Sequence, residues 1–500
     1  MNALTDTRNA PGSAKPLGLL LAALASVASS NVGAADWRMA PPAPAFLTWV
    51  AKTPDDRLPE IMPGDSEAMG FHAGPIRIPM AHENAAAVSG LSQDPLPRRF
   101  DLRFARGVTS VKNQGQCGSC WIFAAYGSME SNLKYRQQQD WNFAEQDINH
   151  AHGFDDPECW GGDNLMATAY LARWSGPFAE EQFPYPYATD ESRRGSGTTM
   201  LTKKHLQEVT LLPERTGSLD NELIKRLIRQ HGGVLAAYRH RKDWYNPETA
   251  AYYYFGEGDP THAITVVGWD DDYPKTAFLE GKQPPGNGAF IIKNSWGPEW
   301  GKKGYFYLSY YDEKISNFTA FHNIQTVGNY TKIYEYDPLG WTSSIGMPES
   351  SEAWFSNLVM AATVAPMIKA VSFYTPVIHS RYDISIYDKV EANQPVSGQK
   401  IATLSGVIGL PGYHTIPLGA PASVTPFKRF AVVVKLTTPG YFYPVPLETR
   451  LEGHSSAAKA TTGESFISAD GITWTDVVTE FDDKLMGPHP HVALKAFGGR

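Results

Sequence analysis

The stretch "QGQCGSCW", residues 114–121, holds two of the three cysteines in this chain of 500 residues. Cys120 opens the run "CWIFAAYGSMESNLKYRQQQ", whose apolar residues recur at helical spacing, so we expect this cysteine at the amino end of a buried helix. The helix dipole and the unpaired N–H groups at such an end stabilise a thiolate, the nucleophilic form of cysteine. Cys117 lies in a glycine-flanked loop without this advantage. The pattern therefore indicates Cys120 as the reactive thiol.

A nucleophilic thiol needs a base that holds its proton and returns it to the leaving amine, and a group that orients the base. Among the 14 histidines, His262 lies at an end of the β-rich run "HAITVVGWD", and Asn294 lies near the end of the run "GAFIIKNSW". A single histidine carries little weight by itself. Together with Cys120, the two residues predict covalent thiol catalysis.

Helices and strands that could hold these residues follow one another in a simple order. After the helix at Cys120, the run "SLDNELIKRLIRQHGG" has apolar residues on one helical face and a glycine stop. The extended runs "HAITVVGWD", "GAFIIKNSW" and "GYFYLSYY" come later and are bounded by Gly, Pro and Asp. Helices first and strands later predict an α+β fold.

Three motifs in order, "QGQCGSCW", "HAITVVGW" and "NSWGPEWGKKGY", resemble the papain family of cysteine peptidases. The stretches "VTSVKNQG", "AEQDI" and "CWGG" add to the resemblance, which covers about residues 96–321. The resemblance implies a two-lobed fold, in which a helical lobe bears Cys120 and a β-barrel-like lobe bears His262 and Asn294. It also implies peptide hydrolysis through a thioester acyl-enzyme, with no metal and no organic cofactor.

The resemblance assigns a role to each residue of the expected catalytic site. Cys120 is the nucleophile and His262 its general acid/base. Asn294 accepts the other ring N–H of the histidine, and Trp296, at the cleft, shields that bond from water. Gln114 donates its side-chain amide, together with the backbone N–H of Cys120, to the oxyanion that forms when the thiolate attacks a carbonyl.

Substrate-binding residues follow from the same resemblance. Gly161 and Gly162 offer backbone hydrogen bonds to an extended peptide, as the edge of a sheet does. Asp163 and Asn164 stand where members of the family commonly place apolar residues of the main specificity pocket, while Ala263 keeps the usual small residue after the histidine. A preference for hydrophobic side chains therefore does not follow from the resemblance.

The resemblance also implies a disulfide between Cys117 and Cys159, which would leave Cys120 as the free thiol. Disulfides form and persist outside the cytosol. The first 35 residues favour such a location, because "LGLLLAALASVA" follows basic residues and precedes small ones, as in a cleaved secretory signal. The alternative is a membrane anchor, for which the apolar run is short. We expect an exported protein, periplasmic or extracellular.

Residues 36–97 are rich in proline and have no sustained helical or alternating pattern, so we interpret them as a pro-segment or linker. We expect processing between Leu96 and Phe100, which would free the cleft of a protease domain at 98–325. Within that domain, residues 271–288 resemble an inserted loop beside the cleft, where the loop would restrict access.

Residues 329–500 have a separate pattern of short alternating runs, among them "YDISIYD", "RFAVVVKLTT" and a hairpin at Asp470-Gly471. We expect an all-β sandwich. The stretch "YEYDPLGWTSSIG" resembles the lectin-like domain that follows the papain-type domain in some bacterial exported peptidases. Trp341, Trp354 and Trp474 could stack on sugars, although aromatic residues of a sandwich more often form the core.

Composition and motifs together select the class of function. A net charge of -8 argues against nucleic-acid binding, which usually needs a basic face. We expect an exported cysteine endopeptidase with protein or peptide substrates, and glycan or cell-envelope binding through the C-terminal domain is an open prediction. One alternative is an exopeptidase restricted by the 271–288 loop. Another is an adhesion or carbohydrate-binding protein whose peptidase domain mainly processes itself.

Overall fold

A computed structural model describes the chain in stretches, at residues 36–57, 69–79, 90–185, 201–361, 366–481 and 489–499. The expected signal peptide, residues 1–35, lies outside the described residues. Of the part of the chain that the structure describes, no helix is long and apolar enough to cross a membrane. In the same part, no group of three His, Cys, Asp or Glu side chains is arranged to hold a metal ion.

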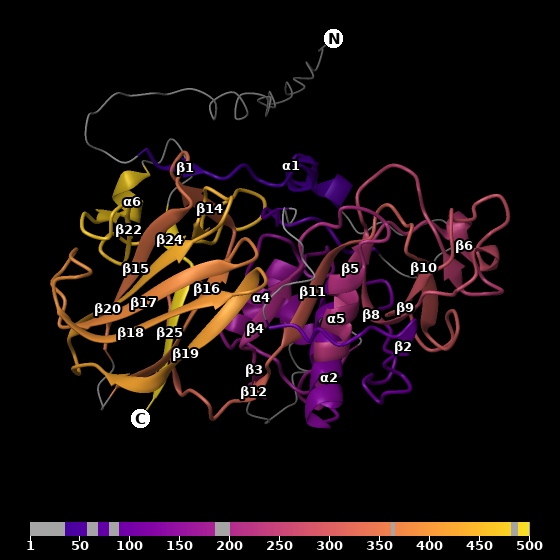
Figure 1. Ribbon diagram of the computed structural model, residues 1–500, viewed down its shortest axis with the longest axis horizontal. Helices are drawn as coiled ribbons and strands as arrows, with labels where there is room; N and C mark the ends of the chain where they lie inside the picture. Colours follow the sequence, from indigo (N-terminus) through magenta and orange to yellow (C-terminus); the bar gives the residue numbers. More distant parts are fainter. Residues whose placement is uncertain are drawn as a thin grey trace, which may run out of the picture. The chain divides into compact units, whose positions relative to one another are not determined.

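The longest helix, α2, begins at Cys120, as the sequence predicts. Its residues are buried on every side as far as Leu133, because it packs against strands of the central sheet and against α4 (Figure 1). The predicted helix in "SLDNELIKRLIRQHGG" is α5, and Gly232 ends it with a φ of +105° that favours glycine. The α-helices are α1 (Pro44–Val50), α2 (Cys120–Gln137), α3 (Glu145–Ala151), α4 (Asn164–Ala172), α5 (Glu222–His231) and α6 (Val477–Glu480).

A large mixed sheet carries the predicted strands β8, β9 and β10 next to one another. Because β8 and β9 are antiparallel, the first residue of β8, His262, lies at the same end of the pair as Asn294, which follows β9. In spatial order the strands are β13 (Lys332–Tyr334), β25 (Leu494–Gly499), β16 (Met367–Thr375), β19 (Gly412–Ser423), β4 (Glu208–Leu211), β11 (Ser316–His322), β5 (Val234–Tyr238), β8 (His262–Asp270), β9 (Ala289–Lys293), β10 (Tyr305–Ser309), β7 (Ala251–Tyr252) and β6 (Tyr245–Asn246), with β2 (Arg99–Asp101) paired to β8.

The C-terminal region is β-rich, as its alternating pattern predicts. Inward-facing residues such as Phe355, Phe373 and Val432 form a core of their own between the sheets. The hairpin at Asp470-Gly471 is present, with β22 and β23 on either side of its loop. The remaining strands are β18 (Gln399–Ile408), β17 (Ser380–Asp388), β20 (Arg429–Thr437), β15 (Glu352–Met360), β22 (Ser465–Ser468) and β23 (Thr475–Asp476) in one sheet, β1 (Arg38–Met39), β14 (Ser343–Gly346), β21 (Val445–Glu448) and β24 (His491–Val492) in another, and the pair β12 (Gln325–Thr326) and β3 (Lys204–His205).

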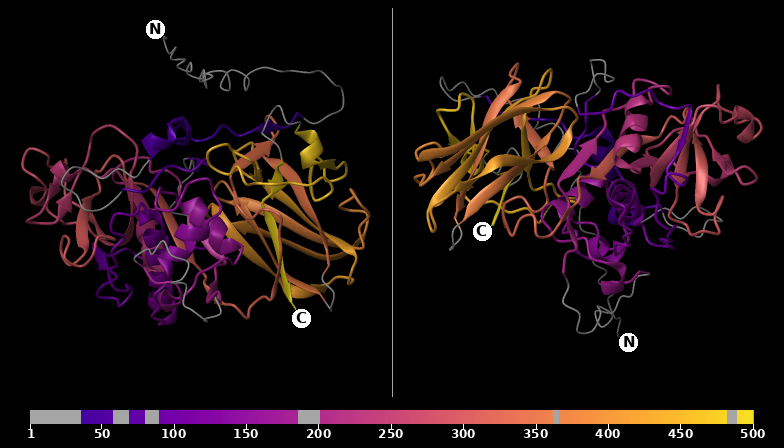
Figure 2. Two further views of the ribbon diagram at one scale, coloured as in Figure 1. Left: turned by 180° about the vertical axis from the view of Figure 1, so that it is seen from behind. Right: turned by 60° about the horizontal axis from the view of Figure 1, so that its bottom comes forward.

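The helical half of the chain and the C-terminal sandwich share a sheet and part of a core. Strand β19 of the sandwich pairs antiparallel with β4. In both views of Figure 2, the orange and yellow strands of the sandwich lie next to the purple and magenta part of the chain. Tyr374 and Tyr413 of the sandwich belong to the same buried cluster as Tyr170 and Leu171 of α4. Two regions that differ in sequence pattern therefore bury apolar surface against each other.

Residues 36–57 contain regular structure that the sequence analysis did not find. Helix α1 begins with Pro44 at its first position, and it buries Phe46 and Trp49. The 7 residues of this helix make about two turns, which is too short for a helical period to stand out. The helix is stabilised by its packing on Leu451 of the sandwich and not by its own pattern.

Candidate active site

Cys120 and His262 come from the two parts of the fold that the resemblance implies. Cys120 is the first residue of α2 and is fully buried. The backbone N–H of Ala263, the residue after His262 on β8, donates to the Cys120 sulfur at 3.4 Å. Cys120 is also the free cysteine of the chain. The contact brings the start of α2 against the start of β8, so the predicted nucleophile and base are neighbours.

Asn294 holds the imidazole of His262 in place. The Nε2 atom of His262 lies 2.8 Å from Oδ1 of Asn294, and this carbonyl oxygen can only accept. The proton is therefore on Nε2, and Nδ1 is left with a lone pair. Trp296 stacks on the imidazole with ring centroids 4.6 Å apart. Nδ1 is buried and has no hydrogen-bond partner among the described residues.

Burial holds the Cys120 thiol and the His262 imidazole in their neutral forms. It raises the pKa of the Cys120 thiol to about 11, although N–H groups of Ala263, Gly70 and Trp121 act in the opposite direction. Burial also lowers the pKa of His262 to about 3, against a smaller opposing effect of the Asn294 bond. The helix end does favour the thiolate, but in this covered state desolvation outweighs it.

The cover is a segment of the same chain, residues 69–79, which we name the strap. The Gly162 N–H donates to the carbonyl of Gly70 at 3.0 Å, and His72 N–H donates to the carbonyl of Gly162 at 3.3 Å. Phe71 N–H donates to the carbonyl of Thr261, next to His262, at 2.9 Å. The strap thus lies along the edge that the sequence analysis assigns to an extended peptide.

Gly70 approaches the predicted nucleophile with its backbone N–H. Its N–H hydrogen-bonds the Cys120 sulfur, whereas its carbonyl oxygen is bonded to Gly162. A Cβ atom at position 70 would lie 1.9 Å from the carbonyl oxygen of Gly118, so only glycine fits. The strap therefore lies directly over Cys120.

Gln114 is buried beside the loop that precedes Cys120. Its side-chain amide donates to the carbonyl of Cys117 at 2.9 Å, and its Oε1 accepts from the Ser295 hydroxyl at 2.6 Å. The second of these bonds joins the Gln114 loop to the residue after Asn294. The oxyanion donor expected from the resemblance is thus fixed between the two catalytic segments.

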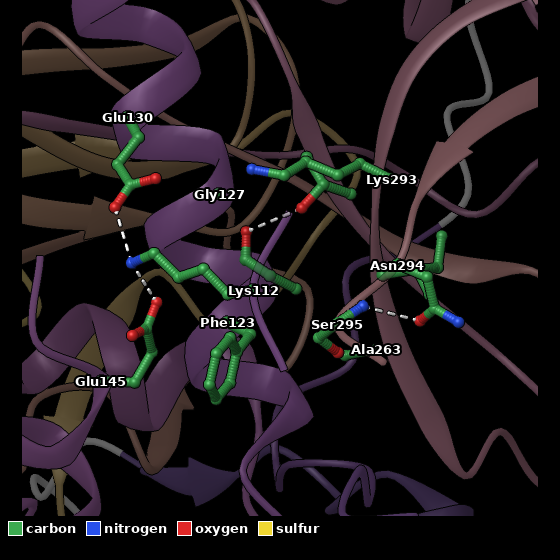
Figure 3. A pocket seen from close by; sticks show the side chains of 12 residues that line it. Lys112, Phe123, Gly127, Glu130, Glu145, Ala263, Lys293, Asn294 and Ser295 are labelled. Carbon is green, nitrogen blue, oxygen red and sulfur yellow. Dashed lines mark hydrogen bonds and ion pairs between the residues drawn. The ribbon is translucent and has the colours of Figure 1, made fainter. Parts of the chain in front are cut away.

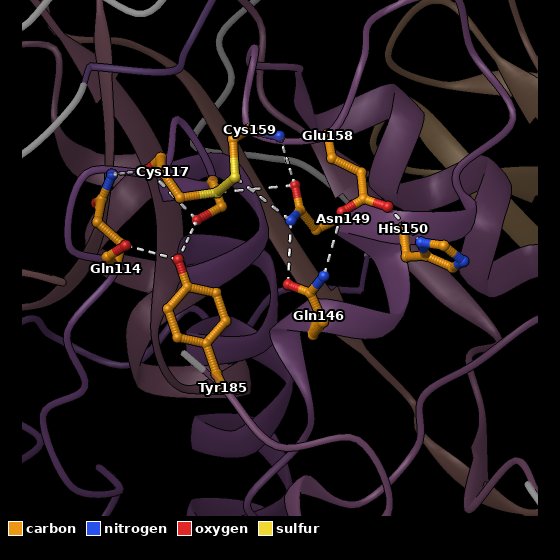
Figure 4. Close-up of a disulfide and its surroundings, with 9 residues drawn as sticks. Gln114, Cys117, Gln146, Asn149, His150, Glu158, Cys159 and Tyr185 are labelled. Atoms are coloured by element: carbon orange, nitrogen blue, oxygen red, sulfur yellow. Dashed lines mark hydrogen bonds and ion pairs between the residues drawn. A yellow bond between two sulfur atoms is a disulfide. The ribbon is translucent and has the colours of Figure 1, made fainter. Parts of the chain in front are cut away.

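A disulfide joins Cys117 to Cys159, with the Cα atoms 4.5 Å apart (Figure 4). The Asn149 side chain accepts from the N–H of Cys159 at 2.9 Å, and Gly118 N–H donates to the carbonyl of Cys159 at 3.0 Å. The loop before Cys120 is therefore linked to the turn that precedes Gly161 and Gly162.

Comparison with protein families agrees with this geometry. Residues 96–323 match the family model described as papain family cysteine protease, and residues 333–498 match the model described as lectin-like domain. Residues 96–323 therefore form a papain-family cysteine protease domain. This domain is followed by a lectin-like domain.

Solved structures of one bacterial protein have the same two-domain organisation, and a viral relative matches less than half of this chain. The protease and lectin-like domains of Cwp84, a surface-layer-associated protein of Clostridium difficile, align with a TM-score of 0.75 at 24% identity, over 93% of this chain and 99% of that chain. Cwp84 after propeptide cleavage aligns with a TM-score of 0.70 at 26% identity, over 80% of this chain and 98% of that chain. The viral cathepsin of Choristoneura fumiferana defective polyhedrosis virus is 32% identical over 235 residues, which are 46% of this chain and 65% of the viral protein.

The pocket residues of the protease domain have structural partners that the sequence does not reveal. Asp163 caps α4, with Oδ1 accepting from Leu165 N–H at 2.6 Å and Met166 N–H at 2.9 Å. Asn164 donates to the Thr319 hydroxyl at 2.9 Å. Asp163 is fully buried, and its second oxygen, Oδ2, has no hydrogen-bond partner among the described residues.

A buried charge cluster behind the catalytic residues was missed by the sequence analysis. Lys112 Nζ lies 2.9 Å from Glu130 of α2 and 2.6 Å from Glu145 of α3 (Figure 3). Lys293, which precedes Asn294, donates to Thr109 in the same cluster, and Thr109 donates to Glu130. The cluster ties α2 and α3 to the end of β9. Lys112 and Glu145 lie in the supporting motifs "VTSVKNQG" and "AEQDI", which were the available signal.

The 271–288 loop lies away from the catalytic pair, so the expectation that it lies beside the cleft is wrong. It joins the end of β8 to the start of β9, whereas His262 and Asn294 occupy the opposite end of this strand pair. The nine residues of β8 place the two ends about 26 Å apart. Phe278 of the loop packs instead with Ala251 and Tyr253 near β7. The sequence shows an insertion but not which end of the hairpin it extends.

Aromatic residues of the lectin-like domain are mostly internal. Trp341 is buried and donates to the Ser344 hydroxyl at 2.8 Å, so the expectation that it could stack on sugars is wrong. Trp354 and Trp474 are half-buried around a small apolar cluster on the outer side of β15, and the Lys435 ammonium lies over the Trp354 ring. The sequence pattern places these tryptophans in the β-rich region, but it does not show how deeply each one is buried.

Proposed function

We propose that the chain is an exported cysteine endopeptidase that hydrolyses peptide bonds through a thioester on Cys120. The observation that carries this proposal is the packing of Cys120 against β8, with His262 oriented by Asn294 and an extended segment lying along Gly162. The substrate class is peptide or protein.

In the proposed reaction, the Cys120 thiolate attacks the carbonyl carbon while His262 holds the thiol proton. The oxyanion accepts hydrogen bonds from the Gln114 side chain and the N–H of Cys120. The C–N bond breaks, the amine leaves with the proton from His262, and a thioester remains. Water, deprotonated by His262, then cleaves the thioester and restores the thiol. Asn294 keeps the ring in the orientation that both steps need.

For the chain's organisation we propose a signal peptide at 1–35, a pro-segment at 36–97, a peptidase domain at 98–325 and a lectin-like domain at 329–500. The strap lies in the proposed pro-segment, so the precursor is a zymogen. Processing between Leu96 and Phe100 is supported by the exposure of Arg98 and Arg99, whose side chains are 73% and 54% exposed. Release of the strap would let water reach the Cys120–His262 pair and favour its ionised form.

Export and surface attachment have their own support. The named relative Cwp84 is a surface-layer-associated protein of its bacterium, and a disulfide suits a protein outside the cytosol. We therefore propose a periplasmic or extracellular location and a role for the lectin-like domain in binding glycans or the cell envelope. An adhesin that mainly processes itself is the second candidate, favoured by the extensive contact between the two domains. The exopeptidase alternative loses its support with the position of the 271–288 loop.

Cleavage of a peptide library by the processed protein, compared with Cys120→Ala, tests the proposal. Internal cleavage that depends on Cys120 is expected of an endopeptidase. Removal of terminal residues alone would contradict it, and self-processing without turnover of added peptides would favour the adhesin.

A further inference from the structure

The strap is a peptide bound in the cleft, so its side chains mark the subsites beside the nucleophile. Gly70 faces Cys120, Phe71 is opposite Gly162 in a bridge, and His72 is the next residue outward. The Phe71 ring belongs to the same apolar cluster as Leu165 and Ala263. The place of Phe71 is therefore apolar, despite the polar residues Asp163 and Asn164 in the sequence.

The place of His72 is different. Its ring is buried, lies flat on the ring of Trp49 with centroids 3.8 Å apart, and approaches Gly161 so closely that a Cβ there would be 3.3 Å from it. The Nε2 atom of His72 lies 3.3 Å from Oδ2 of Asp156, whose side chain is 3% exposed. The strap thus delivers an imidazole to a buried carboxylate.

Asp163 adds a second carboxylate to the same place. Its Oδ2 atom has no hydrogen-bond partner among the described residues and faces the strap, since a Cβ at Gly74 would lie 2.7 Å from it. Burial raises the pKa of Asp163, and the charge of His72 opposes that rise. Capping of α4 uses only Oδ1, so the helix does not account for the second oxygen.

Other charged groups nearby do not neutralise this pair. Burial lowers the pKa of His152 to about 4 and that of His454 to about 3, so both are neutral near pH 7. Arg57 lies over the Trp49 ring and donates to the carbonyl of Gly453 at 3.0 Å. Trp49, Arg57 and His72 all belong to the proposed pro-segment and leave with it. Release of the pro-segment would then take the imidazole of His72 away from the two carboxylates beside Gly161.

We propose that Asp156 and Asp163 form an acidic subsite that selects substrates with a cationic side chain at the third residue from the scissile bond. The neighbouring second residue, in the place of Phe71, is apolar. This inference rests on the proposed function, because it names the substrate class of that peptidase. Carboxylates held in a mostly buried wall are costly unless a cation pairs with them, so a Lys, Arg or protonated His side chain restores the contact that His72 made.

The first test measures substrate selection by the processed protein, which keeps both the protease domain and the lectin-like domain. Fluorogenic peptide amides that differ only in Lys, Gln or Glu at the third residue are compared by kcat/KM. We expect kcat/KM of the Lys peptide to exceed that of the Gln peptide by roughly 10-fold or more, because charge-assisted hydrogen bonds are stronger than neutral ones. The Glu peptide should have the lowest kcat/KM. Asp156→Asn and Asp163→Asn should each reduce the ratio of Lys to Gln. The Asp163→Asn variant keeps a side-chain oxygen that can still accept the hydrogen bonds that cap α4.

A matched control is Asp155→Asn, which removes the adjacent carboxylate. Asp155 binds Ser456 of the lectin-like domain and not the strap, so the ratio should not change. Equal rates for Lys and Gln, or a ratio insensitive to both Asn variants, overturn the proposal. Absence of hydrolysis of every peptide would instead contradict the proposed function.

The second test does not need activity. In the full chain carrying Cys120→Ala, trypsin cleavage after Arg77, whose side chain is 55% exposed, reports how often the strap leaves the cleft. His72→Glu should speed this cleavage at least about 10-fold over His72→Gln, because it places a third carboxylate beside two others. Adding Asp163→Asn to His72→Glu should recover part of the difference, whereas adding Asp155→Asn should not. Equal cleavage of the Glu and Gln variants, without rescue, overturns the acidic subsite.

Discussion

The catalytic wall of the cleft and the strap that covers it are built from different kinds of sequence information. Cys120, His262 and Asn294 each lie within a short motif, and ordinary strand pairing brings them together. The strap has no motif, and its fit depends on contacts with Gly118, Gly162 and Thr261 far along the chain. The proposed chemistry is therefore specified by local motifs, and the proposed latency is specified by long-range shape and charge.

Of the changes to Cys120, His262 and Asn294, removal of the Cys120 thiol should lower the activity most. Cys120→Ala should lower kcat/KM of the processed protein by at least about 10⁴-fold, because no other residue can form the thioester. Mass spectrometry after treatment with an epoxide thiol inhibitor should place the adduct on Cys120 of the unmutated protein. Labelling of Cys117 would contradict the assignment, since that sulfur is held in a disulfide.

Adding a single methyl group to the strap should displace it while Cys120, His262 and Asn294 stay unchanged in sequence. Gly70→Ala puts a Cβ 1.9 Å from the Gly118 carbonyl oxygen, and overpacking of this kind costs about 1–3 kcal/mol. The unprocessed chain should then hydrolyse a small peptide about 10–100 times faster than the unmutated precursor. Gly328→Ala is the matched control, because a Cβ there meets no atom within 4 Å. A silent Gly70→Ala precursor would show that the strap does not hold the enzyme inactive.

Loss of the orienting residue should cost less than loss of the nucleophile. Asn294→Ala removes the acceptor of the His262 Nε2–H bond but leaves thiol and imidazole in place, so we expect kcat to fall about 10–100-fold. Measuring kcat and KM separately checks this, since an orienting role acts mainly on kcat. A drop as deep as that of Cys120→Ala would make Asn294 part of the chemistry itself.

Mild acid should loosen the region where α1 meets the lectin-like domain. Burial lowers the pKa of His454 to about 3, so in the window from about pH 6.5 down to 3 the unfolded chain binds a proton that the folded chain excludes. The free energy of unfolding contributed by this group is therefore present above pH 6.5 and falls as the pH decreases. In thermal melts of the precursor, the melting temperature should fall less between pH 7 and pH 5 in His454→Gln than in the unmutated protein. His379→Gln, at a partly exposed histidine, is the control. An identical dependence of melting temperature on pH in both variants would contradict the prediction.

The sequence predicted the helices at Cys120 and Glu222, the β8–β9–β10 strands and the sandwich, because each has strong periodicity or a family motif. It failed where tertiary contacts decide the outcome. Helix α1 is too short to show a period and depends on Leu451, and a turn-rich insertion looks the same at either end of a hairpin. The acidic pair of Asp156 and Asp163 was out of reach, because its partner His72 lies far away in a stretch without a pattern.

The pairing of β4 with β19 has a consequence for how the protease could search for targets. Domains joined only by a flexible linker sweep a volume set by the length of that linker. Here main-chain hydrogen bonds join one domain to the other. The cleft therefore has a fixed orientation relative to any molecule that the lectin-like domain would bind. An anchored molecule would then cut only those chains that arrive at the right height and angle above the anchoring surface, and geometry would act as a filter before side-chain recognition begins.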